Sequence, residues 1–165
     1  MTSAIEHATG QQTLAAQPDH HIHVEANAGS GKTRVLVNRV ARLLLTGSAP
    51  DRILCLTYTK AAAGEMKSRL FDTLGDWSIA DDETLREKLN RLYNDANREY
   101  SAGDLAEARK LFARALETPG GLAVQTIHAF CQSLLQRFPL EAGLPPGFDI
   151  ADDADNRAIA AEARR

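Results

Sequence analysis

The chain has 165 residues, of which 44% are hydrophobic and 25% are charged, as is typical of a globular protein with one domain of ordinary size. Its formal net charge of -3 gives no overall attraction to nucleic acid or to an anionic membrane, so any polyanion site must be a local patch. Both cysteines lie in apolar stretches without a pairing motif, and neither a signal peptide nor a membrane-spanning run is visible. We therefore expect a cytoplasmic protein without a membrane partner.

A strand followed by a helix is predicted in the first third of the chain. Residues 1–20 are polar and are expected to form a loop and a short helix. Residues 22–25 read as a short buried strand, and residues 34–45 carry apolar side chains at helical spacing, at Leu36, Val40, Leu43 and Leu44. A glycine stop and a proline follow in residues 46–50, as at many helix ends.

The turn between this strand and helix reads Ala-Asn-Ala-Gly-Ser-Gly-Lys-Thr. A glycine-rich turn lets backbone N–H groups converge on an anion, and the positive end of the following helix adds its field. Lys32 would reach the β and γ phosphates of a nucleoside triphosphate, and the Thr33 hydroxyl would ligate Mg²⁺. The strict pattern has glycine at the first position, where this chain has alanine, but the strand and helix provide the expected context. The predicted phosphate-binding residues are Ala26, Asn27, Ala28, Gly29, Ser30, Gly31, Lys32 and Thr33.

The remaining elements predict an α/β fold with a parallel sheet. Residues 53–58 form an uninterrupted β-prone run, typical of a strand covered on both faces, and a helix capped by Thr59 is expected over 60–74. Residues 75–120 carry two amphipathic helical patterns that read as a hairpin inserted between strands. A third strand is predicted at 122–126, a helix at 128–138, and an unfinished helical segment from 141 onward.

Three separated motifs resemble those of UvrD/Rep superfamily 1 DNA helicases: Ala-Asn-Ala-Gly-Ser-Gly-Lys-Thr-Arg at 26–34, Leu-Thr-Tyr-Thr-Lys-Ala-Ala-Ala-Gly-Glu-Met at 56–66, and Gln-Thr-Ile-His-Ala-Phe-Cys at 125–131. Within that family, Ala-Thr-Gly-Gln-Gln at 8–12 and Arg-Phe-Pro-Leu-Glu-Ala-Gly at 137–143 resemble the amino-terminal part of AddA proteins. The resemblance implies a P-loop, RecA-like parallel sheet with helices on both faces and a helical insertion, in an incomplete domain.

The same resemblance implies a division of the chain. Residues 1–74 would be the first part of the ATP-binding domain, 75–120 the helical insertion, 121–140 the third strand and its helix, and 141–165 the start of a truncated helical subdomain.

For ATP and Mg²⁺, the resemblance implies roles residue by residue. Lys32 and Thr33 would be the catalytic residues of the loop, with Thr33 on the metal. Gln12 would hydrogen-bond the adenine edge, with Gln11 as the neighbouring candidate, because a terminal amide offers a donor and an acceptor together. Arg34 would stack on the adenine through its planar guanidinium; the alternative is an ordinary solvated arginine.

For DNA, the resemblance implies contacts at two strand ends. Tyr58, Thr59 and Lys60 would contact single-stranded DNA by stacking and phosphate contacts, without reading base identity. Many relatives have asparagine and then lysine where this chain has Lys60 and an alanine. Thr126 and His128 would contribute from the next strand end, and all these groups would share the carboxyl edge of the sheet.

The implied function is an ATP-dependent 3′-5′ helicase that acts on DNA ends in double-strand break repair with an AddB-like subunit. Hydrolysis also needs an acidic residue on the magnesium and a carboxylate that orients water. The only candidate stretch, residues 148–153, is thinly apolar and reads poorly as such a strand, so we expect no unwinding by this chain alone. The alternatives are a small phosphotransferase of nucleotide-kinase type and a non-catalytic ATP-binding module.

Overall fold

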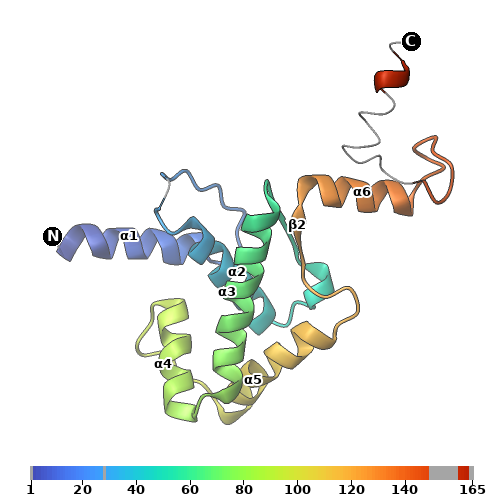
Figure 1. Ribbon diagram of the computed structural model, residues 1–165. Coiled ribbons are helices and arrows are strands. Elements are labelled where there is room, and N and C mark those ends of the chain that lie inside the picture. Colours follow the sequence, from blue (N-terminus) through green and yellow to red (C-terminus); the bar gives the residue numbers. More distant parts are fainter. Residues whose placement is uncertain (1, 28, 149–159, 164–165) are drawn as a thin grey trace. The chain divides into compact units, whose positions relative to one another are not determined.

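The computed structural model describes residues 2–27, 29–148 and 160–163 (Figure 1). Its contacts divide the chain into two compact units, Met1–Thr126 and Ile127–Arg165, which we describe separately. No helix among the described residues has the length and apolar character needed to cross a membrane. The first unit contains these elements: α1 (Thr2–Ala15), α2 (Lys32–Leu45), a 3-10 turn (Pro50–Arg52), β1 (Leu54–Thr57), α3 (Lys60–Ile79), α4 (Asp82–Tyr93), α5 (Ala102–Glu117) and β2 (Ala123–Thr126).

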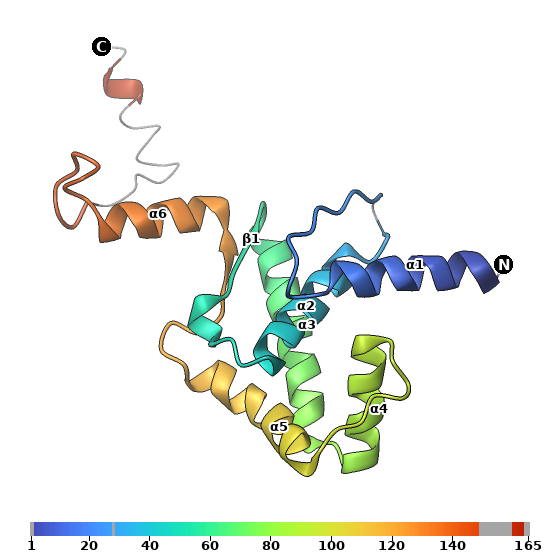
Figure 2. The same ribbon diagram turned by 180° about the vertical axis from the view of Figure 1, so that it is seen from behind.

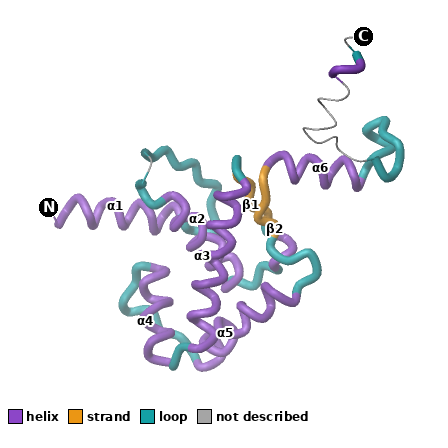
Figure 3. Tube along the Cα trace, viewed as in Figure 1, coloured by secondary structure: helices purple, strands orange, loops and turns teal. Residues whose placement is uncertain are grey.

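The two strands form a parallel pair, which confirms the predicted parallel pairing. β1 pairs with β2 in the register Leu54 to Ala123 through Thr57 to Thr126, and the two strands lie side by side in Figure 3. Both strands contact α3. Their connection runs through α3, α4 and α5, so that the helical insertion lies between paired strands.

One face of this sheet is exposed in the first unit, contrary to the burial on both faces expected from the apolar run. Cys55 is buried, whereas Leu54 and Leu56 are 45% and 41% exposed. Successive side chains of a strand point to opposite faces, so a continuous apolar sequence can cover two faces only when both have packing partners. Among the described residues of this unit, α3 covers one face and leaves the leucines of the other open.

Residues 22–25 do not form the predicted strand. Residues 21–27 have no regular secondary structure, and Ile22 and Val24 are 37% and 43% exposed. A strand requires a neighbour for its N–H and C=O groups. In the part of the chain that the structure describes, β1 and β2 pair with each other, and neither pairs with residues 22–25.

Helices α2 and α3 build the core on which the sheet lies. On α2, Val37, Val40 and Leu44 are buried, while Leu36, one of the apolar residues noted at helical spacing, is 38% exposed. The predicted cap of α3 is confirmed, because the Ala62 N–H donates to Thr59 Oγ1 at 3.1 Å. α3 continues five residues past its predicted end at residue 74, since the buried spacing of Leu70 and Leu74 extends to a Trp77 that is only 3% exposed.

The inserted helices belong to the same core as α2 and α3. Asp81 accepts from the Thr84 N–H at 2.8 Å and begins α4, and Ser101 forms a reciprocal capping box with Asp104 at the start of α5. α5 packs against α3 (Figure 2), and a Cβ on Gly75 of α3 would lie 3.5 Å from the Phe112 ring of α5. Leucines and alanines of α4 and α5 complete this core: Leu85, Leu89, Leu92, Leu105, Ala108, Leu111 and Ala115.

The second unit begins with α6, Ile127–Arg137, which agrees with the predicted helix to within a residue at each end. None of the described side chains of α6 is buried, and Leu134, Leu135 and Phe138 are each more than a third exposed. The acidic stretch considered as a metal-binding strand, from residue 149 onward, lies outside the described residues.

Candidate nucleotide-binding site

The glycine-rich turn leads directly into α2 and has the backbone conformation that its glycines permit. Gly29 has φ 78° and Gly31 has φ 85°, in the left-handed region that side chains with a Cβ rarely adopt. Gly31 is the residue before α2, and its carbonyl accepts from the Val35 N–H at 3.1 Å. The Ser30 N–H donates to the Asn27 carbonyl at 3.3 Å, which closes the turn. Ala28 lies outside the described residues.

Lys32 holds its ammonium group within this turn. Its Nζ donates to the Ala26 carbonyl at 2.7 Å and to the Asn27 carbonyl at 2.6 Å. The first N–H groups of a helix have no acceptor within the helix, so the start of α2 presents free donors beside this ammonium. Thr33 follows on the same turn and is half-buried. The arrangement combines a positive charge with a helix amino terminus, and both features stabilise a bound polyphosphate.

Gln12 and Arg34 contact each other beside the turn. The Gln12 amide donates from Nε2 to the Ser30 carbonyl at 3.2 Å, and its Oε1 accepts from Nη2 of Arg34. A Cβ on Gly31 would lie 3.5 Å from Gln12 Nε2, so the amide packs against the turn. Gln11, the alternative candidate, lines a pocket of about 610 Å³ together with Gln12, Ser30, Lys32 and the segment from His21 to Ala26.

Two further arginines of α2 hold α1 and the segment that follows it, and sequence reasoning missed both. Arg39 donates to the carbonyls of Gln17 and His20, the latter at 2.7 Å. Arg42, which is 2% exposed, donates from Nη1 to the Thr13 carbonyl at 3.0 Å. Burial lowers the pKa of the Arg42 guanidinium below its ordinary value. An arginine on an amphipathic helix is normally taken to face solvent, and no local sequence pattern distinguished these two arginines.

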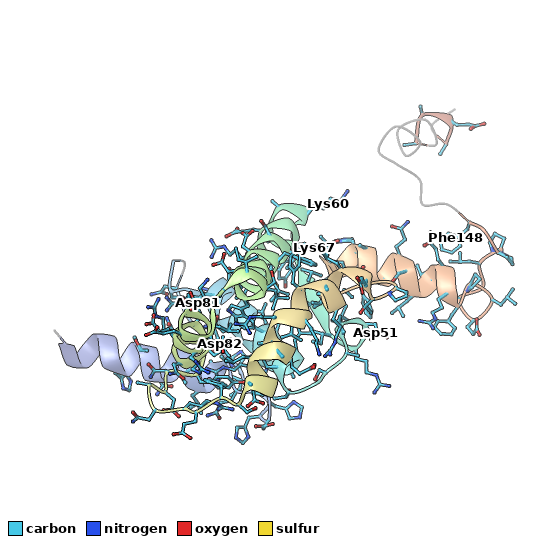
Figure 4. The ribbon with its side chains drawn as sticks, turned by 90° about the horizontal axis from the view of Figure 1, so that it is seen from below. Asp51, Lys60, Lys67, Asp81, Asp82 and Phe148 are labelled. Atoms are coloured by element: carbon cyan, nitrogen blue, oxygen red, sulfur yellow. The ribbon has the colours of Figure 1, made fainter. Side chains whose placement is uncertain are left out.

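The predicted DNA-contacting residues of the first unit gather at one edge of the sheet. Tyr58, 90% exposed, and Thr59 follow the carboxyl end of β1, and Lys60 begins α3 (Figure 4). Thr126 ends β2 and is paired with Thr57, the last residue of β1. His128 lies on α6, which belongs to the second unit, so its place at this edge stays a prediction.

The glycine-rich turn before α2 and the parallel strand pair with its helical insertion are the features that a family assignment has to explain. The model of the UvrD/REP helicase N-terminal domain matches residues 8–165, and the chain belongs to this family. The resemblance seen in the three motifs is thereby confirmed. A family match of this kind does not favour the phosphotransferase alternative.

Three curated relatives of this chain carry the same name. The chain is 35% identical over 157 residues to the ATP-dependent helicase/nuclease A subunit of Levilactobacillus brevis, in a match that covers 94% of this chain and 11% of that protein. It is 33% identical to the protein of the same name from Lactobacillus acidophilus and 30% identical to that from Pediococcus pentosaceus, again over 11% of each relative. The chain thus spans about a tenth of the length of these proteins.

Proposed function

We propose that this chain is the ATP-binding part of a 3′-5′ DNA helicase of the AddA type, which acts on DNA ends in double-strand break repair. In this proposal the domain is a P-loop, RecA-like fold whose sheet carries helices on both faces. It divides into 1–74, the insertion 75–120, the segment 121–140 and a helical subdomain from 141. A cytoplasmic location and an AddB-like partner belong to the same proposal. The name of the relatives supports ATP dependence and helicase activity.

The single observation that carries the proposal is the position of the Lys32 ammonium. It lies 2.7 and 2.6 Å from two carbonyls of a turn whose glycines have positive φ, at the amino end of a 14-residue helix. On ATP binding, Lys32 exchanges these carbonyls for phosphate oxygens of the β and γ groups, which are stronger, charged acceptors. The backbone N–H groups at the start of α2 hold the same phosphates.

The other site residues have complementary proposed roles. Thr33 provides a hydroxyl for Mg²⁺, and the Gln12 amide and the Arg34 guanidinium hold the adenine. Ser30 and Gly31 place backbone groups near the phosphates. Tyr58, Thr59, Lys60, Thr126 and His128 form part of a track for single-stranded DNA, through stacking and backbone contacts.

A substitution at Lys32 tests the proposal. Lys32→Ala should abolish binding of Mg²⁺-ATP, measured by calorimetry or with a fluorescent analogue, and leave the circular dichroism spectrum unchanged. Lys67→Ala is the matched control, because Lys67 is an exposed lysine on α3 (Figure 4) whose ammonium lies over the Phe71 ring of the same helix. Equal ATP affinity in the two variants would contradict the nucleotide proposal.

A further inference from the structure

A pocket of about 450 Å³ lies among α1, α2, α3 and α4, next to the nucleotide site. Gln12 and Arg34, the residues that contact each other beside the glycine-rich turn, line it. The carboxyl-terminal part of the inserted helix α4 lines it through Lys88 and Arg91, and Asn94, the capping residue after α4, lines it as well. The insertion therefore shares a cavity with the proposed adenine-binding residues, and the cavity is within the size range of small-ligand sites.

The lining of this pocket is rich in hydrogen-bond donors. Four cationic side chains line it, against the single carboxylate of Asp76, and that carboxylate is paired with Lys88 at 3.1 Å. The four cations are Arg34, Arg42, Lys88 and Arg91. Adenine presents three ring nitrogens as acceptors, and ribose presents hydroxyl oxygens, so a nucleoside matches a wall made of guanidinium and amide donors.

A buried arginine holds the end of α4 at this pocket. Arg42 donates to the Leu92 carbonyl of α4 and to the Thr13 carbonyl of α1, and its guanidinium lies 4.8 Å from the Tyr93 ring centroid. The Nε atom of Arg42 is buried and has no hydrogen-bond partner among the described residues. Because one buried side chain joins α1, α2 and α4, the pocket is preorganised rather than a loose gap between helices.

Two residues of α4 remain available to a ligand. Arg91 has a side chain 79% exposed and an ion pair at 3.3 Å with Glu87 on its own helix, which is the kind of surface pair that contributes little stability. Asn94 ends α4 in the left-handed conformation, with φ 52° and ψ 43°, and its side chain is exposed at the rim of the pocket. Neither residue is needed for the buried core of the insertion.

We propose that the helical insertion forms one wall of the nucleotide site, with Arg91 and Asn94 contacting the base and ribose of a nucleotide whose triphosphate lies on the glycine-rich turn. This inference rests on the proposed ATP-binding function. Arg34 is two residues after Lys32, within the first turn of α2, so a ligand whose phosphates lie at Lys32 has its nucleoside end beside Gln12 and Arg34. The pocket extends from these two side chains to α4.

The test compares two ligands that share phosphates and differ in the nucleoside. Arg91→Gln should weaken binding of Mg²⁺-ATP by about 5- to 10-fold, and should change binding of tripolyphosphate by less than about twofold. Arg86→Gln is the matched control, because Arg86 also lies on α4 and pairs with an acidic residue one turn earlier, Asp82 at 3.7 Å, but does not line the pocket. Its affinities for both ligands should equal those of the parent protein.

A second variant and three outcomes complete the test. Asn94→Gly keeps the left-handed backbone accessible and should lower ATP affinity about threefold without affecting tripolyphosphate. Equal losses for both ligands would show a general anion site and overturn the inference, as would an Arg91→Gln variant that binds ATP like Arg86→Gln. Failure of the underlying proposal has a different signature: the parent protein would bind neither ligand, or Lys32→Ala would bind both as tightly as the parent.

Discussion

Gln12 of α1 accepts a hydrogen bond from Arg34 of α2, although 22 residues separate them in the chain. The same amide donates to the Ser30 carbonyl, so one side chain joins the first helix to the glycine-rich turn and to the helix that follows it. The contact leaves Arg34 held by a neutral partner. A neutral amide fixes the position of the guanidinium without neutralising its charge, which keeps it available to a nucleotide.

The Gln12 contact predicts a specific effect on nucleotide choice. Gln12→Ala should lower the affinity for ATP and reduce the preference for ATP over GTP, because the variant loses the amide expected at the adenine edge and leaves Arg34 untethered. Calorimetric titration with both nucleotides measures this. Gln11→Ala is the matched control, since Gln11 is exposed on the same helix, and it should retain the preference of the parent protein. A Gln12→Ala variant that keeps its preference would remove Gln12 from base recognition.

Backbone conformation predicts opposite effects for a glycine of the turn and a glycine of α1. Gly31 has φ 85°, so Gly31→Ala should destabilise the protein by about 1–2 kcal/mol, the cost of a left-handed alanine. Gly10 lies within α1 with open space around it, and Gly10→Ala should stabilise the protein by about 0.5–1 kcal/mol. Urea unfolding of the two variants measures both changes. A neutral Gly31→Ala substitution would show that the turn does not need its left-handed geometry.

Local signals in the sequence predicted α2 to α6 and the strand pair well, but the expected loop and short helix of residues 1–20 is a 14-residue helix, α1. Thr59 and the Ser101–Asp104 pair satisfy free N–H groups at helix starts, and such caps are recognisable from a few consecutive residues. The parallel pairing of β1 and β2 also followed from alternating strands and helices. The residue types of the glycine-rich turn also predicted that a helix, α2, follows it, whereas the contact of Lys32 with phosphates stays a prediction.

Non-local relationships were predicted less well. The apolar run around Leu54 and Leu56 predicted burial on both faces, but burial depends on which elements pack there, and α3 covers one face. Residues 22–25 have the composition of a strand and no strand partner among the described residues. Arg42 reads as a surface residue in its own helix. It is buried because carbonyls of α1 and α4 approach it, a contact between segments up to 50 residues apart.

Tyr100 predicts a loss of stability at alkaline pH. Burial raises the pKa of Tyr100 to about 12 from its ordinary value of 10.0, so the folded state keeps the neutral phenol where the unfolded chain ionises. The unfolded state then binds fewer protons, and stability should fall as the pH rises from about 10 to about 12. The buried hydroxyl has no hydrogen-bond partner among the described residues, so Tyr100→Phe should cost little at neutral pH.

Chemical unfolding at a series of pH values checks this prediction. The parent protein should lose stability across the interval from about 10 to about 12 more steeply than Tyr100→Phe, which has no group to ionise at that position. The nearby guanidiniums of Arg98 and Arg42 favour the ionised phenol and so oppose the shift without reversing it. Identical pH profiles for the two proteins would contradict the inferred burial of the Tyr100 hydroxyl.

The exposed ring of Tyr58 predicts a contribution to DNA binding that is separable from stability. Tyr58 is 90% exposed beyond the carboxyl end of β1, so Tyr58→Ala removes almost no packing and should leave the unfolding midpoint unchanged. If a base stacks on this ring, the substitution should weaken binding of single-stranded DNA by about 1–3 kcal/mol, measured by fluorescence anisotropy with a labelled oligonucleotide.

A matched control separates this contact from the general loss of an exposed apolar side chain. Ile79 is 86% exposed at the opposite end of α3 from Lys60, and Ile79→Ala should bind DNA as the parent protein does. Tyr58→Phe should retain most of the affinity, because stacking needs the ring and not the hydroxyl. If Tyr58→Ala binds single-stranded DNA as tightly as Ile79→Ala, the strand end after β1 does not contact the nucleic acid through its aromatic side chain.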